Sequence, residues 1–326
     1  NTIFWASFIL ALSAGNHSAF ALGDGYPYPI HGYVFLDYNS NRRLDVREAC
    51  SGVGVSDGFQ VVLTDTNGYY LLTNSERCAK AVFVSQPSNA RKTSFGFYRL
   101  LETNTPDQGF DFPLKPLDPS CPTNSTFFAA IGDIHTDTAA NRDQQNAAMN
   151  ELRGLTPVPD FTVVLGDSVE NGTGLQFDRY QEAEGTNRFA VFHVSGNHDD
   201  VNGDGVEFRK RFGPDYYSFD HGGVHFIVRN VMTASRNQNI WLQNELATFG
   251  PGKLVVFFQH FVPTADDLEI FDRLNIHSVF SAHWHSDKYV QSAKTISWNI
   301  PPFIMGGVDC SPRGFGLAHI DSKGSL

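Results

Sequence analysis

Residues 278–285 read SVFSAHWH, an apolar run that ends in two histidines two positions apart. The stretch from His277 to Ala282 is typical of a buried β-strand, and side chains alternate between the two faces of a strand. If strand geometry persists to the end of this run, the imidazoles of His283 and His285 point to one side and Trp284 points to the other. Neutral imidazoles that share a side most often share a metal ion, and the alternative is a pair of half-exposed loop histidines.

The same arrangement recurs along residues 123–326, where the apolar runs FFAAIGD, FTVVLGD, FAVFHVSGNHDD and LVVFFQH also end in metal-capable side chains. These runs alternate with helix-like segments such as NRDQQNAAMNELRG and QNIWLQNELATF, which predicts an α/β domain around a largely buried sheet. Sites in open α/β sheets form at the carboxyl ends of the strands, so we expect the polar residues there to converge. They are Asp133, His135, Asp167, Asn197, His198, Asp199, Asp200, His260, His283 and His285.

The types of these side chains indicate what they could bind. A single Asp or His after a strand is more often a capping or hydrogen-bonded residue, but here five runs end in the same way. Carboxylate, amide and imidazole groups together predict a mixed oxygen and nitrogen site for two divalent metal ions. Thiolates are absent from the set, which disfavours a structural zinc finger.

Composition narrows the class of protein. The 326 residues are 41% hydrophobic and 18% charged, as in a globular protein. The net charge of −11 argues against generic nucleic-acid binding, which requires a basic surface. Small phosphate esters are not excluded, because the charge of a bound metal outweighs the global balance locally.

The first residues predict export. Phe4–Leu12 is apolar but too short to span a bilayer, and Ala19–Phe20–Ala21 fits a small-x-small cleavage site. We interpret residues 1–21 as a secretory signal peptide, and the alternative is a buried N-terminal helix. The expected location is secreted, periplasmic or at the cell surface, with no transmembrane span after removal of the signal. An oxidising compartment would allow the four cysteines to form disulfides, and domain membership suggests Cys50–Cys78 and Cys121–Cys310.

Residues 26–112 have an all-β texture and are predicted to form a small accessory domain, followed by a proline-rich linker over residues 113–122. Within the accessory domain, residues 37–48 carry oxygen side chains at positions 1, 3, 5, 9 and 12 of an EF-hand-like calcium loop. These side chains belong to Asp37, Asn39, Asn41, Asp45 and Glu48. Arg42 occupies position 6, where glycine normally makes the sharp turn, so an ordinary polar turn is the alternative. A second stretch, DVNGDG at residues 200–205, has Arg211 at position 12 and is interpreted as a turn.

The ordered blocks GDIH, GD, GNHD, H and AHWH resemble the signature of calcineurin-like metallophosphoesterases from Phe127 to His285. The resemblance implies a four-layer α/β/β/α sandwich and two divalent metals, with Mn, Fe and Zn all compatible. It assigns one metal to Asp133, His135 and His285, the other to Asn197, His260 and His283, and the bridge to Asp167. It also implies that a hydroxide bridging the metals attacks phosphorus, and that His198, with Asp199 beside it, protonates the leaving group.

Two departures from the family pattern bear on the site. Ala282 replaces the usual glycine before H-x-H, a small-for-small change that we expect to be tolerated. Glu170 stands where purple acid phosphatases carry a ligand tyrosine, which disfavours a tyrosinate–iron site. Asp137 and Asp200 are candidates to orient the ligand histidines, and the alternative is that they are solvated.

The accessory domain resembles the calcium-binding B-type (SD-repeat-like) β-sandwich modules of bacterial surface proteins, and the β-domain that precedes some calcineurin-like phosphoesterases. Taken together, the resemblances imply a secreted metal-dependent phosphomonoesterase or phosphodiesterase. Its expected substrate is a phosphorylated small molecule or a lipid headgroup. The alternative is a non-catalytic surface or binding protein that retains the phosphoesterase fold.

Overall fold

The computed structural model describes residues 26, 28–73, 79–93, 96–102, 105–119, 124–185, 187, 189–233, 235–304, 312–321 and 323. The predicted signal peptide, residues 1–21, lies outside these ranges, as do Cys78, Cys121 and Cys310. Cys50 is buried, and both disulfides remain predictions. Among the described residues, no helix has the length and apolar character needed to cross a bilayer.

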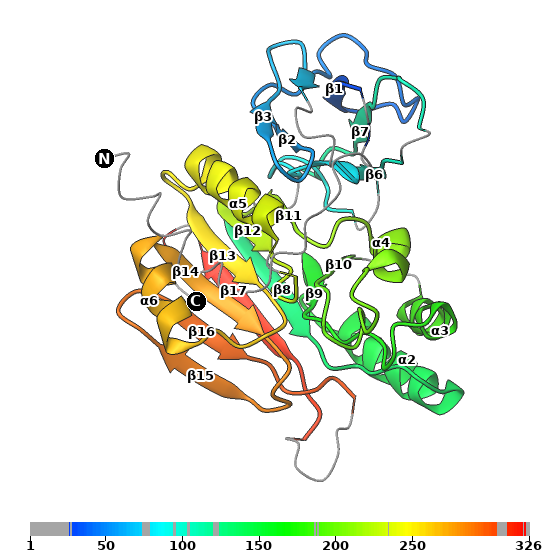
Figure 1. Ribbon diagram of the computed structural model, residues 1–326, viewed down its shortest axis with the longest axis vertical. Coiled ribbons are helices and arrows are strands. Elements are labelled where there is room, and N and C mark those ends of the chain that lie inside the picture. The colour runs from blue at the N-terminus through cyan, green and yellow to red at the C-terminus, as the bar shows by residue number, and fades with distance from the viewer. Residues whose placement is uncertain are drawn as a thin grey trace.

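Two sheets form the centre of the larger, C-terminal part (Figure 1). The four-stranded sheet has the order β10-β9-β8-β17, with β8 (Ser125–Ile131), β9 (Phe161–Val164), β10 (Ala190–His193) and β17 (Gly316–Asp321). The six-stranded sheet has the order β11-β12-β13-β14-β16-β15. Its strands are β11 (Tyr217–His221), β12 (Val224–Val228), β13 (Leu254–Phe258), β14 (Ile276–Ser281), β15 (Lys288–Gln291) and β16 (Ile296–Asn299). Strands β8, β9 and β10 run parallel to one another, as do β12, β13, β14 and β16.

Helices cover the outer faces of the two sheets. They are α2 (Ala139–Arg153), α3 (Gly174–Glu184), α4 (Val206–Phe212), α5 (Arg236–Phe249) and α6 (Ala265–Arg273). Four of them begin at a hydroxyl side chain that accepts a backbone N–H of the first turn, as preferred N-cap residues do. The caps are Thr138, Thr173, Ser235 and Thr264.

Phenylalanine rings fill the space between the sheets. Phe128 of β8 stacks on Phe161 of β9 at 5.1 Å and meets the edges of Phe258 and Phe280, from the other sheet, at 5.5 and 5.1 Å. The next residue of β8, Ala129, belongs to a second apolar cluster with residues of α2 and α3. Because strand side chains alternate, β8 serves both the inter-sheet core and the helix layer. The predicted four-layer sandwich is thereby confirmed.

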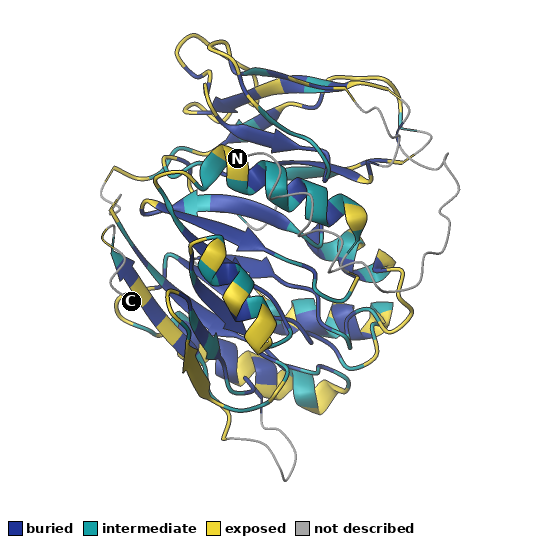
Figure 2. Ribbon diagram, turned by 60° about the vertical axis from the view of Figure 1, so that its left-hand side comes forward, coloured by how far each residue is buried: buried dark blue, intermediate teal, exposed yellow. Residues whose placement is uncertain are grey.

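The N-terminal strands form two further sheets with a core of their own (Figure 2). One has the order β4-β1-β7, with β1 (Ile30–Leu36), β4 (Tyr69–Leu72) and β7 (Phe112–Leu114). The other has the order β3-β2-β5-β6, with β2 (Gly54–Ser56), β3 (Val61–Leu63), β5 (Ala81–Val84) and β6 (Tyr98–Leu100). Residues 113 and 114, which the sequence assigns to a linker, belong instead to β7. Pro113 is accommodated because β7 lies at an edge of its sheet.

The N-terminal sheets are joined to the larger part by apolar and polar contacts. Phe83 of β5 and Phe97 belong to the same apolar cluster as the phenylalanines between the central sheets. The hydroxyl of Ser218 donates to that of Ser85 at 2.8 Å, and the side-chain amide of Asn244 donates to the carbonyl of Phe59 at 3.0 Å. The accessory part therefore keeps a core of its own and also contributes Phe83 and Phe97 to the core of the part that carries the predicted site.

Candidate metal centre

The loops that follow five strands carry the predicted ligands to one region. Three of these strands, β8, β9 and β10, belong to the four-stranded sheet, and two, β13 and β14, belong to the six-stranded sheet. Parallel strands direct their carboxyl ends to the same edge, so loops distant in sequence meet there. Within the described residues, three groups have metal-capable atoms that all lie within 4.8 Å of one another. They are Asp133 with His135 and His285, Asp167 with His260 and His283, and His135 with Asp167 and His198.

His283 and His285 reach the site in a different way from that predicted. Strand β14 ends at Ser281, before either histidine, and both have left-handed backbone angles, with φ of 73° and 47°. The bend sends them to different groups, His283 towards His260 and His285 towards His135. Strand alternation is therefore the wrong reason, although both imidazoles join the site. Trp284 is 52% exposed.

The environment of His260 suits a bound cation. Its Nδ1 donates to the carbonyl of Leu165 at 2.8 Å, which leaves the lone pair of a neutral ring on Nε2. That atom lies 3.1 Å from Oδ2 of Asp167 and 3.0 Å from Oδ1 of Asn197. Three electron-rich atoms therefore face one another, an arrangement that only a proton or a metal ion stabilises.

The environment of His135 repeats this pattern. Its Nδ1 donates to Oε2 of Glu170 at 2.8 Å, and its Nε2 lies 3.3 Å from Nε2 of His285 and 3.7 Å from Oδ2 of Asp167. The same oxygen of Asp167 thus faces the imidazoles of both groups. This donor set of imidazole nitrogens and carboxylate oxygens suits two divalent ions that share one carboxylate.

Burial sets the protonation of the surrounding groups. It lowers the pKa of His135, His283 and His285, so these rings are neutral at neutral pH, the form that binds metals. Burial also raises the pKa of Asp133 to about 7, although its carboxylate accepts the backbone N–H of His283 at 3.0 and 3.1 Å. A cation at this position would remove the cost of burying the charged carboxylate.

The backbone of the site is strained. Nine non-glycine residues in the described ranges have positive φ, and five of them are predicted ligands. Left-handed angles are costly for residues with a Cβ and concentrate at functional sites. The five are Asp133, His135, Asp167, His283 and His285.

Glycines allow the loops to approach one another. A Cβ on Gly196 would lie 2.2 Å from Oδ1 of Asp167, and a Cβ on Gly166 would lie 2.5 Å from Nδ1 of His260. The substitution of alanine for glycine at Ala282 is accommodated by the opposite loop. The Ala282 methyl is buried against Gly132, where an added Cβ would lie 2.8 Å away. Ala282 in place of the family glycine therefore requires glycine at position 132.

His198 is held at the edge of the site with its side chain 35% exposed. Its Nδ1 donates to the carbonyl of Glu170 at 2.7 Å, and its backbone N–H donates to Oδ1 of Asp167 at 2.9 Å. Asp199 is buried and accepts the backbone N–H groups of Gly196 and Val169, so it braces the GNHD loop from beneath. Burial raises the pKa of Asp199 to about 8.

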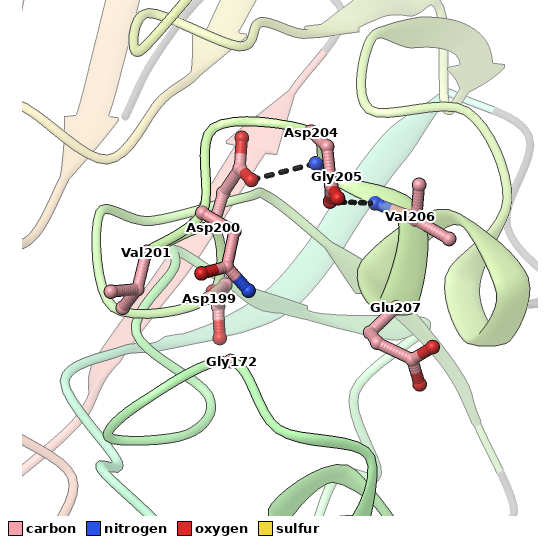
Figure 3. Close-up of a pocket in the computed structure, with 9 residues that line it drawn as sticks. Gly172, Asp199, Asp200, Val201, Asp204, Gly205, Val206 and Glu207 are labelled. Carbon is pink, nitrogen blue, oxygen red and sulfur yellow. Dashed lines mark hydrogen bonds between the residues drawn. The ribbon is translucent and has the colours of Figure 1, made fainter.

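The loop after GNHD forms a turn, as predicted for DVNGDG. Figure 3 shows that Oδ1 of Asp200 accepts the backbone N–H of Gly205, and Oδ1 of Asp204 accepts that of Val206, at 2.6 and 2.9 Å. The carboxylates line a pocket of about 250 Å³ and are occupied with the turn's own backbone. Asp200 is therefore not positioned to orient a ligand histidine.

Glu170 is the residue of the site that sequence reasoning missed. It was considered only as the replacement for a tyrosine, yet it holds both His135, through its carboxylate, and His198, through its carbonyl. Asp137, the candidate for such a role, accepts the side-chain amide of Gln176 at 2.7 Å instead. Glu170 lies only three residues after Asp167 in the sequence. However, only the fold shows that its loop meets the loop that carries His135.

The predicted calcium loop is closed by its own hydrogen bonds. Both oxygens of Asp37 accept backbone N–H groups of the loop, each at 3.1 Å, and both oxygens of Glu48 do so at 3.0 and 3.1 Å. Asp45 accepts the amides of Asn39 and Asn41 at 2.8 Å, and this donation lowers its pKa. Among the residues that the structure describes, these carboxylates form no group of three within 4.8 Å. Calcium binding here remains a prediction.

Comparison with known families agrees with the geometry. A family described as "Calcineurin-like phosphoesterase" matches residues 128–287, and one described as "N terminal of Calcineurin-like phosphoesterase" matches residues 41–117. Together the two ranges span well over half of the chain. Calcineurin-like phosphoesterases use a dinuclear centre of divalent metals, and the groups of Asp and His described above are candidate ligands for it.

Among curated proteins, the chain is similar to "Serine/threonine-protein phosphatase CPPED1" of Danio rerio. The two are 31% identical over 178 residues, which is 42% of this chain and 58% of the relative. The Mus musculus protein of the same name is 30% identical over 179 residues, or 42% of this chain and 57% of the relative. The chain therefore spans less than two thirds of the length of these relatives.

Two solved structures show a weaker likeness. "GAP50 the anchor in the inner membrane complex of Plasmodium" has a TM-score of 0.46 and 11% identity, covering 61% of this chain and 82% of that one. Vacuolar Protein Sorting 29 from Cryptosporidium parvum has a TM-score of 0.36 and 14% identity, covering 61% and 86%. Both TM-scores lie below 0.5, so the assignment rests on the sequence matches. The chain belongs to the calcineurin-like phosphoesterase family.

Proposed function

We propose that this protein hydrolyses phosphate esters at a centre of two divalent metal ions. The residues that would hold the ions are Asp133, His135 and His285 on one side, Asn197, His260 and His283 on the other, and Asp167 between them. The observation that best supports the proposal is the position of Oδ2 of Asp167. It lies 3.1 Å from Nε2 of His260 and 3.7 Å from Nε2 of His135, so one carboxylate oxygen faces the imidazoles of both halves of the site.

The metal ions and the side chains of the protein would contribute different parts of the reaction. When bound, two divalent ions would neutralise the charge of the phosphoryl oxygens and activate the attacking water. Asn197 offers an amide oxygen to the site, which adds no negative charge to repel an anionic ester. Glu170 fixes the ring of His135 through Nδ1, so that Nε2 is directed into the centre.

We assign to His198 the role of general acid. Hydrolysis of a phosphate ester releases an alkoxide, which is unstable at neutral pH unless it gains a proton as the bond breaks. The carbonyl of Glu170 holds Nδ1 of His198, so Nε2 is the nitrogen that is free to deliver this proton. The partly exposed ring is accessible to a substrate, whereas the neighbouring Asp199 is buried and acts on the loop backbone.

The identity of the ester follows less directly from the site. Phosphomonoesters, phosphodiesters and lipid headgroups are all compatible with the ligand set. The names of the curated relatives add phosphorylated serine and threonine side chains to the candidates. Secretion remains part of the proposal through the predicted signal peptide, and Mn, Fe and Zn all suit these ligands.

The test is metal analysis combined with an activity screen. The purified chain, loaded separately with Mn²⁺, Fe²⁺ or Zn²⁺, should bind two ions and hydrolyse p-nitrophenyl phosphate or bis(p-nitrophenyl) phosphate. A chelator should abolish turnover, and the metal should restore it. A panel of alkyl monoesters, diesters and phosphoserine peptides then ranks the substrate classes. Two bound ions without hydrolysis of any ester would favour the alternative, a binding protein that retains the fold.

A further inference from the structure

A cavity of about 430 Å³ adjoins the candidate metal centre, and its lining includes His283. It is formed by residues that follow β12, β13 and β14 and by the first turns of α5 and α6, which lie on the same face of the six-stranded sheet (Figure 1). Its size suits the organic part of a small ester. What it binds therefore bears on substrate choice, and the inference drawn below rests on the proposed function.

Arg229 is the one cation in the lining of this cavity. Its Nη1 donates to Oε1 of Gln259 at 2.9 Å, and its guanidinium lies 4.9 Å from the ring centre of Phe257 and 5.2 Å from that of Phe271. No carboxylate in the described part of the chain lies within 4.0 Å of it. An arginine carries five N–H donors, so most of its capacity is unused.

Two pairs of the other polar residues of the cavity are engaged with each other. The side chain of Gln238 accepts the backbone N–H of Asn230 at 2.9 Å and donates to its carbonyl at 2.7 Å. Asp267, the carboxylate in the lining, accepts the backbone N–H and the hydroxyl of Thr264, at 2.9 and 2.7 Å, in the cap of α6. Arg229 is thus left as the charged donor able to meet a ligand.

The surroundings of Arg229 make an unpaired guanidinium costly. Burial lowers its pKa to about 10, and the partial positive ends of α5 and α6 also face the cavity. Asp267 is too far away to form an ion pair. An anion entering the cavity would relieve this cost, and a planar oxyanion matches the fork of the guanidinium with two hydrogen bonds.

We infer that the cavity receives the organic part of the phosphate ester, and that Arg229 recognises a second oxyanion on it, a carboxylate or a second phosphate. Phe261 and Trp284 supply apolar surface in the same lining. The substrate class is then a phosphorylated small molecule with two acidic groups. One is held at the metal centre and the other at Arg229.

Matched esters test this inference. The metal-loaded enzyme should hydrolyse 3-phosphoglycerate or glycerol 2,3-bisphosphate with a kcat/KM at least about 10-fold above that for glycerol 3-phosphate, since a charged hydrogen bond contributes that scale of energy. Arg229→Gln should remove most of this preference and leave glycerol 3-phosphate within a few-fold. A comparison of 3-phosphoglycerate with glycerol 2,3-bisphosphate shows whether Arg229 prefers a carboxylate or a second phosphate. Arg273→Gln, which removes an exposed arginine on α6, is the matched control.

A second variant, Gln259→Glu, is needed in case Arg229→Gln fails to fold. It would pair the guanidinium of Arg229 with a carboxylate and leave the Arg229 side chain packed on Phe257 and Phe271. It should abolish the preference as well. Equal kcat/KM for acidic and neutral esters in the wild type, or an unchanged preference in both variants, would overturn the inference. If no ester is hydrolysed, the proposed function fails separately. In that case an Arg229-dependent rise in melting temperature of the metal-free protein with 3-phosphoglycerate would still support the oxyanion site, and no rise would overturn it.

Discussion

The candidate metal centre and the loop over residues 37–48 were both predicted from the positions of metal-capable side chains, the centre from strand ends and the loop from the spacing within twelve residues. The structure shows that the two sites differ in how their acceptor atoms are paired. At the centre, Nε2 of His260 lies 3.1 Å from Asp167 and 3.0 Å from Asn197, so the three groups compete for one proton or one cation. In the loop, the carboxylates of Asp37 and Glu48 already accept backbone N–H groups. Position in the sequence identifies candidate ligands, whereas acceptors that face one another in the fold identify where a cation would bind.

The strongest test of this comparison is Asp167→Asn, since one oxygen serves both halves of the centre. The amide is isosteric but uncharged, and turnover should fall on the order of 10⁴-fold, as when a charged residue of a catalytic unit is removed. Metal analysis should show loss of at least one ion. Asp137→Asn, whose carboxylate meets only Gln176 and no ligand, is the control. Two ions per chain and near-normal turnover in Asp167→Asn would refute the bridging role.

The second test concerns His198, which lies among the histidines of the centre but is proposed to donate a proton. His198→Ala should slow alkyl phosphate esters by about 10²–10⁴-fold, the usual contribution of general acid catalysis. The loss should be much smaller with p-nitrophenyl esters, because their phenolate leaves without a proton. Two metal ions should remain bound.

The exposed His319 on β17 supplies a control substitution of the same kind, His319→Ala. A loss of metal in His198→Ala would place this side chain among the ligands, which the grouping of His198 with His135 and Asp167 also allows. Equal losses on both classes of ester would argue against proton donation.

The third test concerns Glu170, which contacts a predicted ligand of the metal centre but is not itself a predicted ligand. Glu170→Gln keeps a hydrogen-bond acceptor for Nδ1 of His135 but removes the charge. Metal affinity should fall by about 10–100-fold, as for other partners of ligand histidines. Titration of the metal-free protein with Zn²⁺ measures this directly. Glu182→Gln, an exposed carboxylate on α3 paired with Arg142, should change nothing. An unaltered affinity in Glu170→Gln would show that this carboxylate does not support the metal.

The smallest effect is expected at the loop over residues 37–48. If calcium binds there, saturating Ca²⁺ at about 100 times the Kd adds about 2.7 kcal/mol to the free energy of unfolding of the full chain, and the melting temperature rises by a few degrees. Glu48→Gln should abolish most of that rise, whereas Glu102→Gln, which changes an exposed carboxylate of the N-terminal part outside the loop, should not. The absence of any rise in the wild type would reduce the loop to a turn closed by its own hydrogen bonds.

Most residues of the candidate site could be predicted from the sequence, because they come directly after the apolar runs that form strands. The runs ending at Asp133, Asp167 and His260 needed only the rule that parallel strands share an edge. The bend that separates His283 from His285 was not predictable, because strand periodicity says nothing about residues beyond the strand. Glu170 was missed because its partner lies 35 residues away, and only tertiary contact reveals it.

The accessory part shows the same limit. The all-β texture of residues 26–112 predicted strands there, and the six strands β1 to β6 do lie within this range. The boundary at residue 112 was too early, because Pro113 signals a loop locally but is tolerated in an edge strand. The local pattern also does not reveal that Phe83 and Phe97 pack among the phenylalanines of the larger part. An apolar pattern predicts that a face is buried, but not which residues cover it.

The left-handed ligands carry a consequence for evolution and for engineering. Each of the five residues with positive φ costs the folded chain about 1–3 kcal/mol relative to an unstrained position, and glycine would remove that cost. His283→Gly or Asp133→Gly should therefore relieve backbone strain while removing a ligand. Selection for thermal stability alone would erode the centre first. Five strained side chains at one edge of the sheets therefore mark a trade-off between the stability of the fold and the geometry of the candidate centre.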